Sequence, residues 1–131
     1  MIGIDTNDLV RFLVADDERQ FEKARRLIRQ EAAGGDAVLI SKLVLLECEW
    51  VLRSRYSLAK QAILGAFSGL LDSTEVRIED EGIVEEALYV WKDTGADFAD
   101  CLIAAKYRAL GCSSTISFDA RAAKLPGFRL A

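Results

Sequence analysis

The chain has 131 residues, of which 51% are apolar, and its formal net charge is −4. This length suggests one domain with a proper core, and the composition excludes a disordered chain. The absence of histidine excludes His-dependent catalytic triads and His-ligated zinc, and the acidic balance excludes nucleic-acid binding by charge alone. A polyanionic substrate would need a neutralising partner, for which a divalent cation is the obvious candidate.

Short apolar segments alternate with longer amphipathic segments along the whole chain. We expect strands at about 2–5, 37–40, 75–78, 114–117 and 128–130. We expect helices at about 7–14, 17–32, 42–55, 58–71, 81–93 and 97–110, with a short helical turn at 120–125. This alternation is typical of an α/β fold in which helices flank a central, mostly parallel sheet of four to five short strands. No repeat or linker interrupts the alternation, so residues 1–131 are predicted to form a single domain.

Polar residues mark the ends of several predicted elements. Ser41 and Asp80 each precede a helix and can cap it. In a parallel α/β sheet, ligands bind beyond the carboxyl ends of the strands. Asp5 and Asp119 both lie just past a predicted strand, so they lie at the edge where an active site is expected.

No apolar run reaches the roughly 18 residues that a membrane-spanning helix needs, and the N-terminus lacks the pattern of a signal peptide. The three cysteines, Cys48, Cys101 and Cys112, have no CxxC spacing, and each lies in an apolar context. They are predicted to be buried thiols in a reducing compartment. We therefore expect a cytoplasmic protein.

The opening sequence MIGIDTNDLVRFL places Asp5 between a short apolar strand and an amphipathic helix. As a structural residue Asp5 would cap that helix, since Asp is favoured at this position. Thr6 or Asn7 could cap the helix equally well, so a functional role for Asp5 stays open.

The segment LVLLECEWVL carries Glu47 inside a predicted helix. Leu43, Trp50 and Val51 lie on the same face as Glu47, whereas Glu49 is rotated from it by about 200° and can face solvent. A carboxylate on an apolar face is costly unless it is paired or binds a metal. An ion pair or a position at the rim would explain Glu47, but we favour a functional role.

In GADFADCLIAAKY, Asp97 and Asp100 start a helix with the spacing of a capping box. The same spacing places both carboxylates on one side of the first turn. Asp100 shares its face with Ile103, Ala104 and Tyr107, which favours a functional role for this residue. For Asp97, the role of a helix cap is at least as well supported as a functional role.

Asp119 follows the predicted strand STIS with one residue between them. It could simply cap the helical turn at 120–125. Ser117 and Thr115 supply hydroxyl groups that could orient a carboxylate or a metal-bound water.

Three or four of these carboxylates share one small site if the sheet brings their elements together. Like charges at such distances cannot all ionise without compensation. Mg²⁺ or Mn²⁺ would offset the repulsion, and both ions prefer oxygen ligands. A cation held there lowers the pKa of a bound water, so the predicted chemistry is the hydrolysis of a phosphodiester.

The sequence resembles the PIN-domain ribonucleases, in particular the VapC-type toxins of bacterial and archaeal toxin–antitoxin pairs. The resemblance covers nearly the whole chain and rests, in order and spacing, on IDTNDLVRFL, LVLLECEWVL, DFADCLIAAKYRALGC and TISFDARAAKLPG. The positions that match the family's acidic quartet are Asp5, Glu47, Asp100 and Asp119. The accompanying polar positions, which would support the site without binding the metal directly, are Thr6, Asn7, Asp97 and Ser117.

The resemblance implies a Mg²⁺-dependent endoribonuclease that inhibits translation by cutting RNA, with Mn²⁺ as an alternative ion. It also implies a homodimer and silencing by a cognate antitoxin. The basic residues nearest the proposed site, Arg121 and Lys124, are our preferred contacts to RNA phosphates. The helices at about 42–71 carry apolar residues that either complete the core or form a groove for a partner helix. These residues are Leu45, Leu52, Leu58, Ile63, Leu64, Phe67 and Leu70.

Two other classes of function remain open. Asp5 could accept a phosphoryl group as in the haloacid-dehalogenase phosphatases, but these need a second Asp where this chain has Asn7. A response-regulator receiver needs a phosphoacceptor after its third strand, a pattern that Ile78, Glu79 and Asp80 fit poorly. An interaction module whose acids serve only as caps would bind no Mg²⁺.

Overall fold

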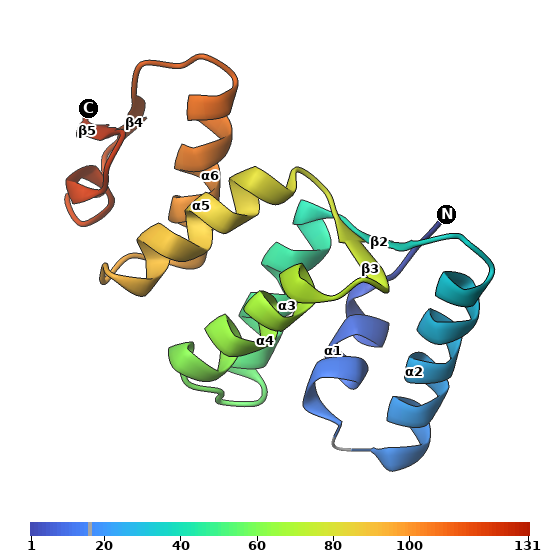
Figure 1. The fold of residues 1–131 in the computed structure, drawn as a ribbon. Helices are drawn as coiled ribbons and strands as arrows, with labels where there is room; N and C mark the ends of the chain where they lie inside the picture. Colours follow the sequence, from blue (N-terminus) through green and yellow to red (C-terminus); the bar gives the residue numbers. More distant parts are fainter. Residues whose placement is uncertain (16) are drawn as a thin grey trace. The chain divides into compact units, whose positions relative to one another are not determined.

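The computed structural model describes residues 1–15 and 17–131, which divide into two units, Met1–Glu79 and Asp80–Ala131 (Figure 1). The sheet of the N-terminal unit consists of β1 (Ile2–Gly3), β2 (Val38–Ile40) and β3 (Val76–Ile78). The three strands are parallel with β2 in the middle, and Val38 is in register with both Ile2 and Val76. The helices of this unit are α1 (Thr6–Val14), α2 (Glu18–Ala33), α3 (Lys42–Ser54) and α4 (Lys60–Asp72).

The C-terminal unit begins with two helices that pack against each other, α5 (Glu81–Lys92) and α6 (Phe98–Ala109). They are followed by β4 (Thr115–Ser117), a 3₁₀ turn η1 (Ala122–Lys124) and β5 (Phe128–Leu130). The two strands form a parallel pair.

The structure confirms the predicted α/β fold with short parallel strands and flanking helices. Each predicted helix and strand is present, with ends that differ by at most two residues from the expected ones. The strands are divided between a three-stranded and a two-stranded sheet. Among the residues that the structure describes, no helix is both long and apolar enough to cross a membrane.

One face of each helix builds the core of the N-terminal unit. Helix α1 packs against α2 and α3 and buries Leu9 and Val10. In the central strand, Ile40 is completely buried, and such burial of a large aliphatic side chain is worth about 1.5–3 kcal/mol. The rings of Phe12 and Phe21 stack with their centroids 5.9 Å apart, which adds an aromatic contact between α1 and α2.

The core of the C-terminal unit lies between α5 and α6. Trp91 and Phe98 pack with ring centroids 5.2 Å apart, and both side chains are buried. Ala87 and Ala105 are completely buried and let the two helices approach closely. This packing fixes the first turn of α6, which carries Asp100.

The two predicted caps behave differently. Ser41 caps α3 as expected, since its side chain accepts a hydrogen bond from the backbone N–H of Val44 at 3.1 Å. Asp80 precedes α5 but makes no cap hydrogen bond, so its predicted role is wrong. Its backbone is left-handed, with φ of 50°, whereas a capping side chain needs an extended backbone. The carboxylate of Asp80 instead pairs with Lys106 at 3.0 Å.

The cysteines are buried at Cys48 and Cys101, but Cys112 is exposed, so the prediction of three buried thiols is wrong for Cys112. Cys112 lies just after α6, at a turn where Gly111 has a positive φ. Burial, and to a lesser extent the charge of Glu49, raises the pKa of the Cys48 thiol to about 12.

These surroundings predict that Cys112 is the only cysteine of the native chain that reacts rapidly with Ellman's reagent. The thiolate is the reactive form, and buried thiols are both protonated and inaccessible. All three cysteines should react after unfolding in guanidinium chloride. Rapid reaction of Cys48 or Cys101 in the native protein, seen as colour that persists in a Cys112→Ser variant, would contradict the described core.

Candidate active site

The predicted acidic quartet is divided between the two units. Asp5 and Glu47 belong to the N-terminal unit, and Asp100 and Asp119 belong to the C-terminal unit. Each pair has surroundings that the structure describes within its own unit. The convergence of all four carboxylates on one site stays a prediction.

Asp5 is exposed and lies between β1 and α1. Its Oδ1 accepts a hydrogen bond from the backbone N–H of Thr6 at 2.8 Å, so Asp5 itself caps α1. Thr6 is buried, with an exposed fraction of 5%, whereas Asn7 is exposed. A carboxylate has about four lone-pair sites, so capping leaves Asp5 able to accept further bonds from a cation or a water.

Glu47 and Glu49 exchange the positions that the sequence analysis predicted for them. Glu49 is buried, with an exposed fraction of 3%, and its Oε2 pairs with the guanidinium of Arg53 at 2.8 Å. Glu47 is exposed, and it forms no ion pair within the described part of the chain. The neighbours Leu43 and Trp50 share its face as predicted, but their side chains are 78% and 51% exposed.

The cause of this exchange is that α3 is apolar on almost every side. Its buried face is formed by Leu45, Cys48 and Leu52, one turn apart from each other, and Glu49 lies at the border of this face. Arg53, one turn further on, neutralises the buried carboxylate of Glu49. The acid with a structural role is therefore Glu49, and the carboxylate of Glu47 is available for chemistry.

The charges of two carboxylates, Asp97 and Asp119, act on a third, Asp100, in the C-terminal unit. Asp100 is half-buried on the first turn of α6, and its pKa is raised above the usual value. Burial is the largest cause, followed by the charge of Asp97 and then by the charge of Asp119. Asp119 is far from Asp100 in the sequence, so this interaction supports the prediction that the two acids lie near each other in space. Asp97 precedes α6 but makes no cap hydrogen bond, so its predicted role as a cap is not realised.

Asp119 is held by short local hydrogen bonds. Its Oδ1 accepts a hydrogen bond from the backbone N–H of Arg121 at 2.9 Å, so it caps the following turn as expected. Its own backbone N–H donates to Oγ of Ser117 at 3.0 Å. Ser117 therefore fixes the backbone of Asp119 after β4.

Arg121 and Lys124 line a cavity of about 410 Å³ in the same unit. Both side chains are exposed. The opposite wall is the segment 94–96, which leads directly into Asp97. The sequence analysis missed this wall, although the small residues Gly95 and Ala96 before Asp97 are a signal for open space. The cavity therefore places the positively charged side chains of Arg121 and Lys124 near the segment that leads into Asp97.

The comparisons with known proteins decide the family. The family model described as PIN domain matches residues 2–127. The chain belongs to the PIN domain family. Among solved structures, the chain is similar to VapC20 of Mycobacterium tuberculosis, described as a sarcin–ricin loop cleaving toxin. The two are 25% identical over 95% of this chain and 96% of that chain, with a TM-score of 0.42. Comparison with curated proteins found no relative.

The donor groups of this PIN domain suit a hard divalent cation. Within residues 1–15 and 17–131, no three His, Cys, Asp or Glu side chains are arranged to hold a metal ion. Mg²⁺ needs no such trio, because it is usually held by one or two carboxylates and keeps several waters. Asp97, Asp100 and Asp119 offer only oxygen ligands, and the repulsion that raises the pKa of Asp100 would be offset by a cation.

Proposed function

We propose that this PIN domain is a Mg²⁺-dependent endoribonuclease and the toxin of a toxin–antitoxin pair, which inhibits translation by cutting RNA. The observation that carries the proposal is the interaction of Asp97, Asp100 and Asp119 in a chain that belongs to this family. Family membership favours the nuclease over the phosphoaspartate proteins and the interaction module. The protein is proposed to act in the cytoplasm as a homodimer.

Asp5, Glu47, Asp100 and Asp119 are proposed to hold the cation. We expect Mn²⁺ to replace Mg²⁺ in this role, because both ions prefer oxygen ligands. When bound, the cation lowers the pKa of a water and offsets charge on the phosphate. Glu47 is exposed and can accept a proton from the attacking water. Attack by water leaves a 5′-phosphate and a 3′-hydroxyl.

The remaining polar residues are proposed to support these four carboxylates. Ser117 holds the backbone of Asp119, and the charge of Asp97 acts on Asp100. Asn7 is exposed beside Asp5, whereas the buried Thr6 acts through its packing in the core. Arg121 and Lys124 are proposed to bind phosphates of the RNA from the cavity that they line.

The test is a cleavage assay with purified protein and total RNA, in Mg²⁺, in Mn²⁺ and in EDTA. The proposal expects cleavage with either ion, none in EDTA, and new ends that carry a 5′-phosphate. Cleavage that persists in EDTA, or ends with a 2′,3′-cyclic phosphate, would contradict it. No cleavage of any RNA in Mg²⁺ would favour the interaction module.

The antitoxin is proposed to dock on the part of the chain around 42–71, but mostly through side chains other than those that the sequence analysis named. Six of those seven side chains are buried in the core: Leu45, Leu52, Ile63, Leu64, Phe67 and Leu70. Leu58 is half-buried. Their apolar surface mainly completes the fold, so most of a docking surface must come from other residues. Among the seven, Leu70 also lines a groove.

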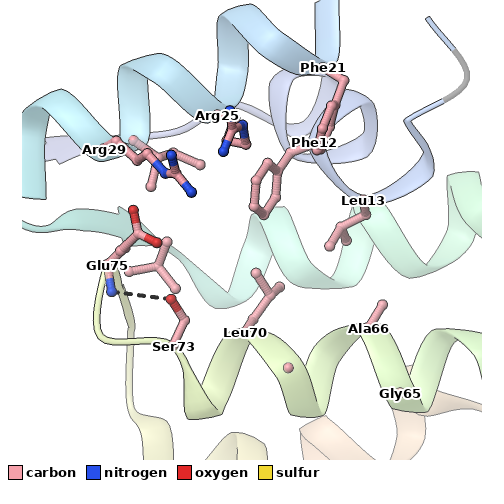
Figure 2. Close-up of a pocket in the computed structure, with 13 residues that line it drawn as sticks. Phe12, Leu13, Phe21, Arg25, Arg29, Gly65, Ala66, Leu70, Ser73 and Glu75 are labelled. Carbon is pink, nitrogen blue, oxygen red and sulfur yellow. Dashed lines mark hydrogen bonds between the residues drawn. The ribbon is translucent and has the colours of Figure 1, made fainter. Parts of the chain in front are cut away.

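A groove of about 420 Å³ runs between α4 and the pair α1 and α2; we call it the α4 groove (Figure 2). Its floor is apolar, with Phe12 and Phe21 opposite the small residues Gly65 and Gly69. A Cβ atom at either glycine would meet no atom within 4 Å. The missing side chains of α4 therefore leave space that a partner can fill.

The rim of the α4 groove is basic. Arg25 and Arg29 of α2 line it, whereas Glu75 is the one acid among the described residues of its lining (Figure 2). Arg25 pairs with Glu22 of its own helix at 3.3 Å, and Arg29 has no ion pair with any residue that the structure describes. An antitoxin segment with apolar side chains and a carboxylate at their edge complements this groove.

We expect Gly65→Leu and Gly69→Leu to weaken antitoxin binding by at least about tenfold, because the new side chains fill the α4 groove. The stability of the toxin should stay equal or rise by about 0.5–1 kcal/mol, since glycine is unfavourable inside a helix. Calorimetric titration with the product of the adjacent small open reading frame measures the affinity. Gly82→Leu in α5, which also meets no atom within 4 Å, is the matched control. Unchanged affinity for both groove variants would contradict this docking site.

A further inference from the structure

A second cleft of the N-terminal unit is lined mainly by polar and charged residues, whereas the floor of the α4 groove is apolar. It has a volume of about 580 Å³ and is lined by residues of α1, α2 and the end of α3. Its basic residues are Arg11, Lys23 and Arg55, and we call it the Arg11 cleft. Ile4 and Asn7, which flank Asp5 in the sequence, line the same cleft. The cleft therefore begins next to a carboxylate of the proposed active site.

The charge in the Arg11 cleft is strongly positive for a protein with a net charge of −4. Arg11, Lys23 and Arg55 come from three different helices or their ends, and the one carboxylate among the described residues that line the cleft is that of Asp8. Like charges gathered in this way repel one another. A polyanion bound in the cleft would offset this repulsion.

Some basic residues elsewhere in the chain have carboxylate partners, as in the pairs Arg53–Glu49 and Arg108–Glu86. Two basic residues of the Arg11 cleft differ from these. In the part of the chain that the structure describes, neither Lys23 nor Arg55 forms an ion pair. Their charges therefore remain available to a ligand.

Two features suit the cleft to phosphodiesters in particular. Nη1 of Arg11 donates a hydrogen bond to the hydroxyl of Tyr56 at 3.2 Å, which helps to hold the guanidinium in place. A guanidinium binds phosphate in a bidentate manner. The amides of Asn7 and Gln20 also line the cleft and can bond to phosphate or ribose oxygens.

We propose that the Arg11 cleft binds the sugar–phosphate backbone of single-stranded RNA beside the bond that is cut. This inference rests on the proposed function, because it assigns a path to the substrate of that site. The cleft supplies affinity that does not depend on base sequence, and it guides the strand toward Asp5.

The test measures binding of a fluorescein-labelled single-stranded RNA of mixed sequence by anisotropy, across a series of KCl concentrations. All proteins carry Asp100→Asn and are kept in EDTA, so the RNA stays intact. Lys23→Gln with Arg55→Gln should raise the Kd about tenfold or more and lower the slope of log Kd against log[KCl] by about 1.4. Adding Arg11→Gln should lower the slope by about 2 in total.

The control is the double variant Arg77→Gln with Lys92→Gln, which removes the same charge from exposed positions outside the cleft. Its Kd should change much less than that of the cleft variant. The double cleft variant keeps the Arg11–Tyr56 hydrogen bond, and its melting temperature should match the parent. Asp8→Asn removes the one acid that the described part of the chain contributes to the cleft lining, and it should tighten RNA binding.

Equal Kd values and salt slopes for the cleft and control variants would overturn the inference. Loss of antitoxin binding with unchanged RNA binding would also overturn it, because the cleft would then serve a protein partner. Binding in EDTA is measured apart from cleavage. If the cleft variants bind RNA as the parent does and the wild-type protein cuts RNA with Mg²⁺, the cleft has no role in RNA binding. The proposed function would then still stand.

Discussion

Asp100→Asn is expected to lower Mg²⁺-dependent RNA cleavage by a factor of about 10³ or more. The substitution keeps the size of the side chain and removes a negative charge that is proposed to hold the cation. Electrostatic groups at a reacting centre carry effects of this order. The same assay, with initial rates at saturating Mg²⁺, measures the loss.

The folded protein should tolerate Asp100→Asn without loss of stability. Burial and the charges of Asp97 and Asp119 raise the pKa of Asp100, so its ionised form is disfavoured in the folded chain. A neutral amide removes this repulsion, and the melting temperature in EDTA should stay equal or rise. Asp72→Asn, at an exposed position at the end of α4, is the matched control and should keep full activity. Full activity of Asp100→Asn would refute the assignment.

Glu47→Gln and Glu49→Gln are expected to have opposite effects, although the two residues are almost adjacent. Glu47→Gln should lower cleavage by about 10²–10⁴, the range for loss of a residue that accepts or positions a proton. Its melting temperature should not change, because Glu47 is exposed and makes no ion pair within the described residues.

Glu49→Gln should instead destabilise the fold by about 1–2 kcal/mol, because it weakens a charge-assisted bond of a buried side chain to Arg53. This protein should retain cleavage at temperatures where it is folded. Each variant serves as the control for the other, because the chemical change is the same. A Glu49→Gln protein that is stable but inactive, beside an active Glu47→Gln protein, would reverse the assignment.

The sequence predicted the helices and strands well, because their signals are local. Ser41 and the glycines at helix ends act within one turn, and the short apolar strands differ clearly from the helices around them. The position of Asp5 between β1 and α1 and of Asp100 on the first turn of α6 follows from the same local signals.

The faces of α3 were harder to predict, because a helix with large apolar residues on almost every side has no unique buried side. Leu43 and Trp50 are large and apolar but exposed, whereas Glu49 is buried through its bond to Arg53. Periodicity shows which residues share a face, and it grouped Glu47 correctly with Leu43 and Trp50. It does not show which face the rest of the fold covers.

Both clefts of the N-terminal unit lay beyond the reach of sequence reasoning for a different reason. The α4 groove exists because Gly65 and Gly69 lack side chains. A search of the sequence for apolar residues identifies side chains, but it does not identify the empty space beside a glycine. The Arg11 cleft joins Arg11, Lys23 and Arg55, whose spacing in the chain follows no motif. Only packing of three helices makes these residues neighbours.

The claim on which the account depends is that acids from both units bind one cation site. Anomalous diffraction from crystals that contain Mn²⁺ tests it most directly. The account predicts one or two manganese peaks, with carboxylate oxygens at about 2 Å that include Asp5 or Glu47 and also Asp100 or Asp119. Manganese bound by residues of one unit alone, or absent from these four carboxylates in ordered crystals, would contradict the account.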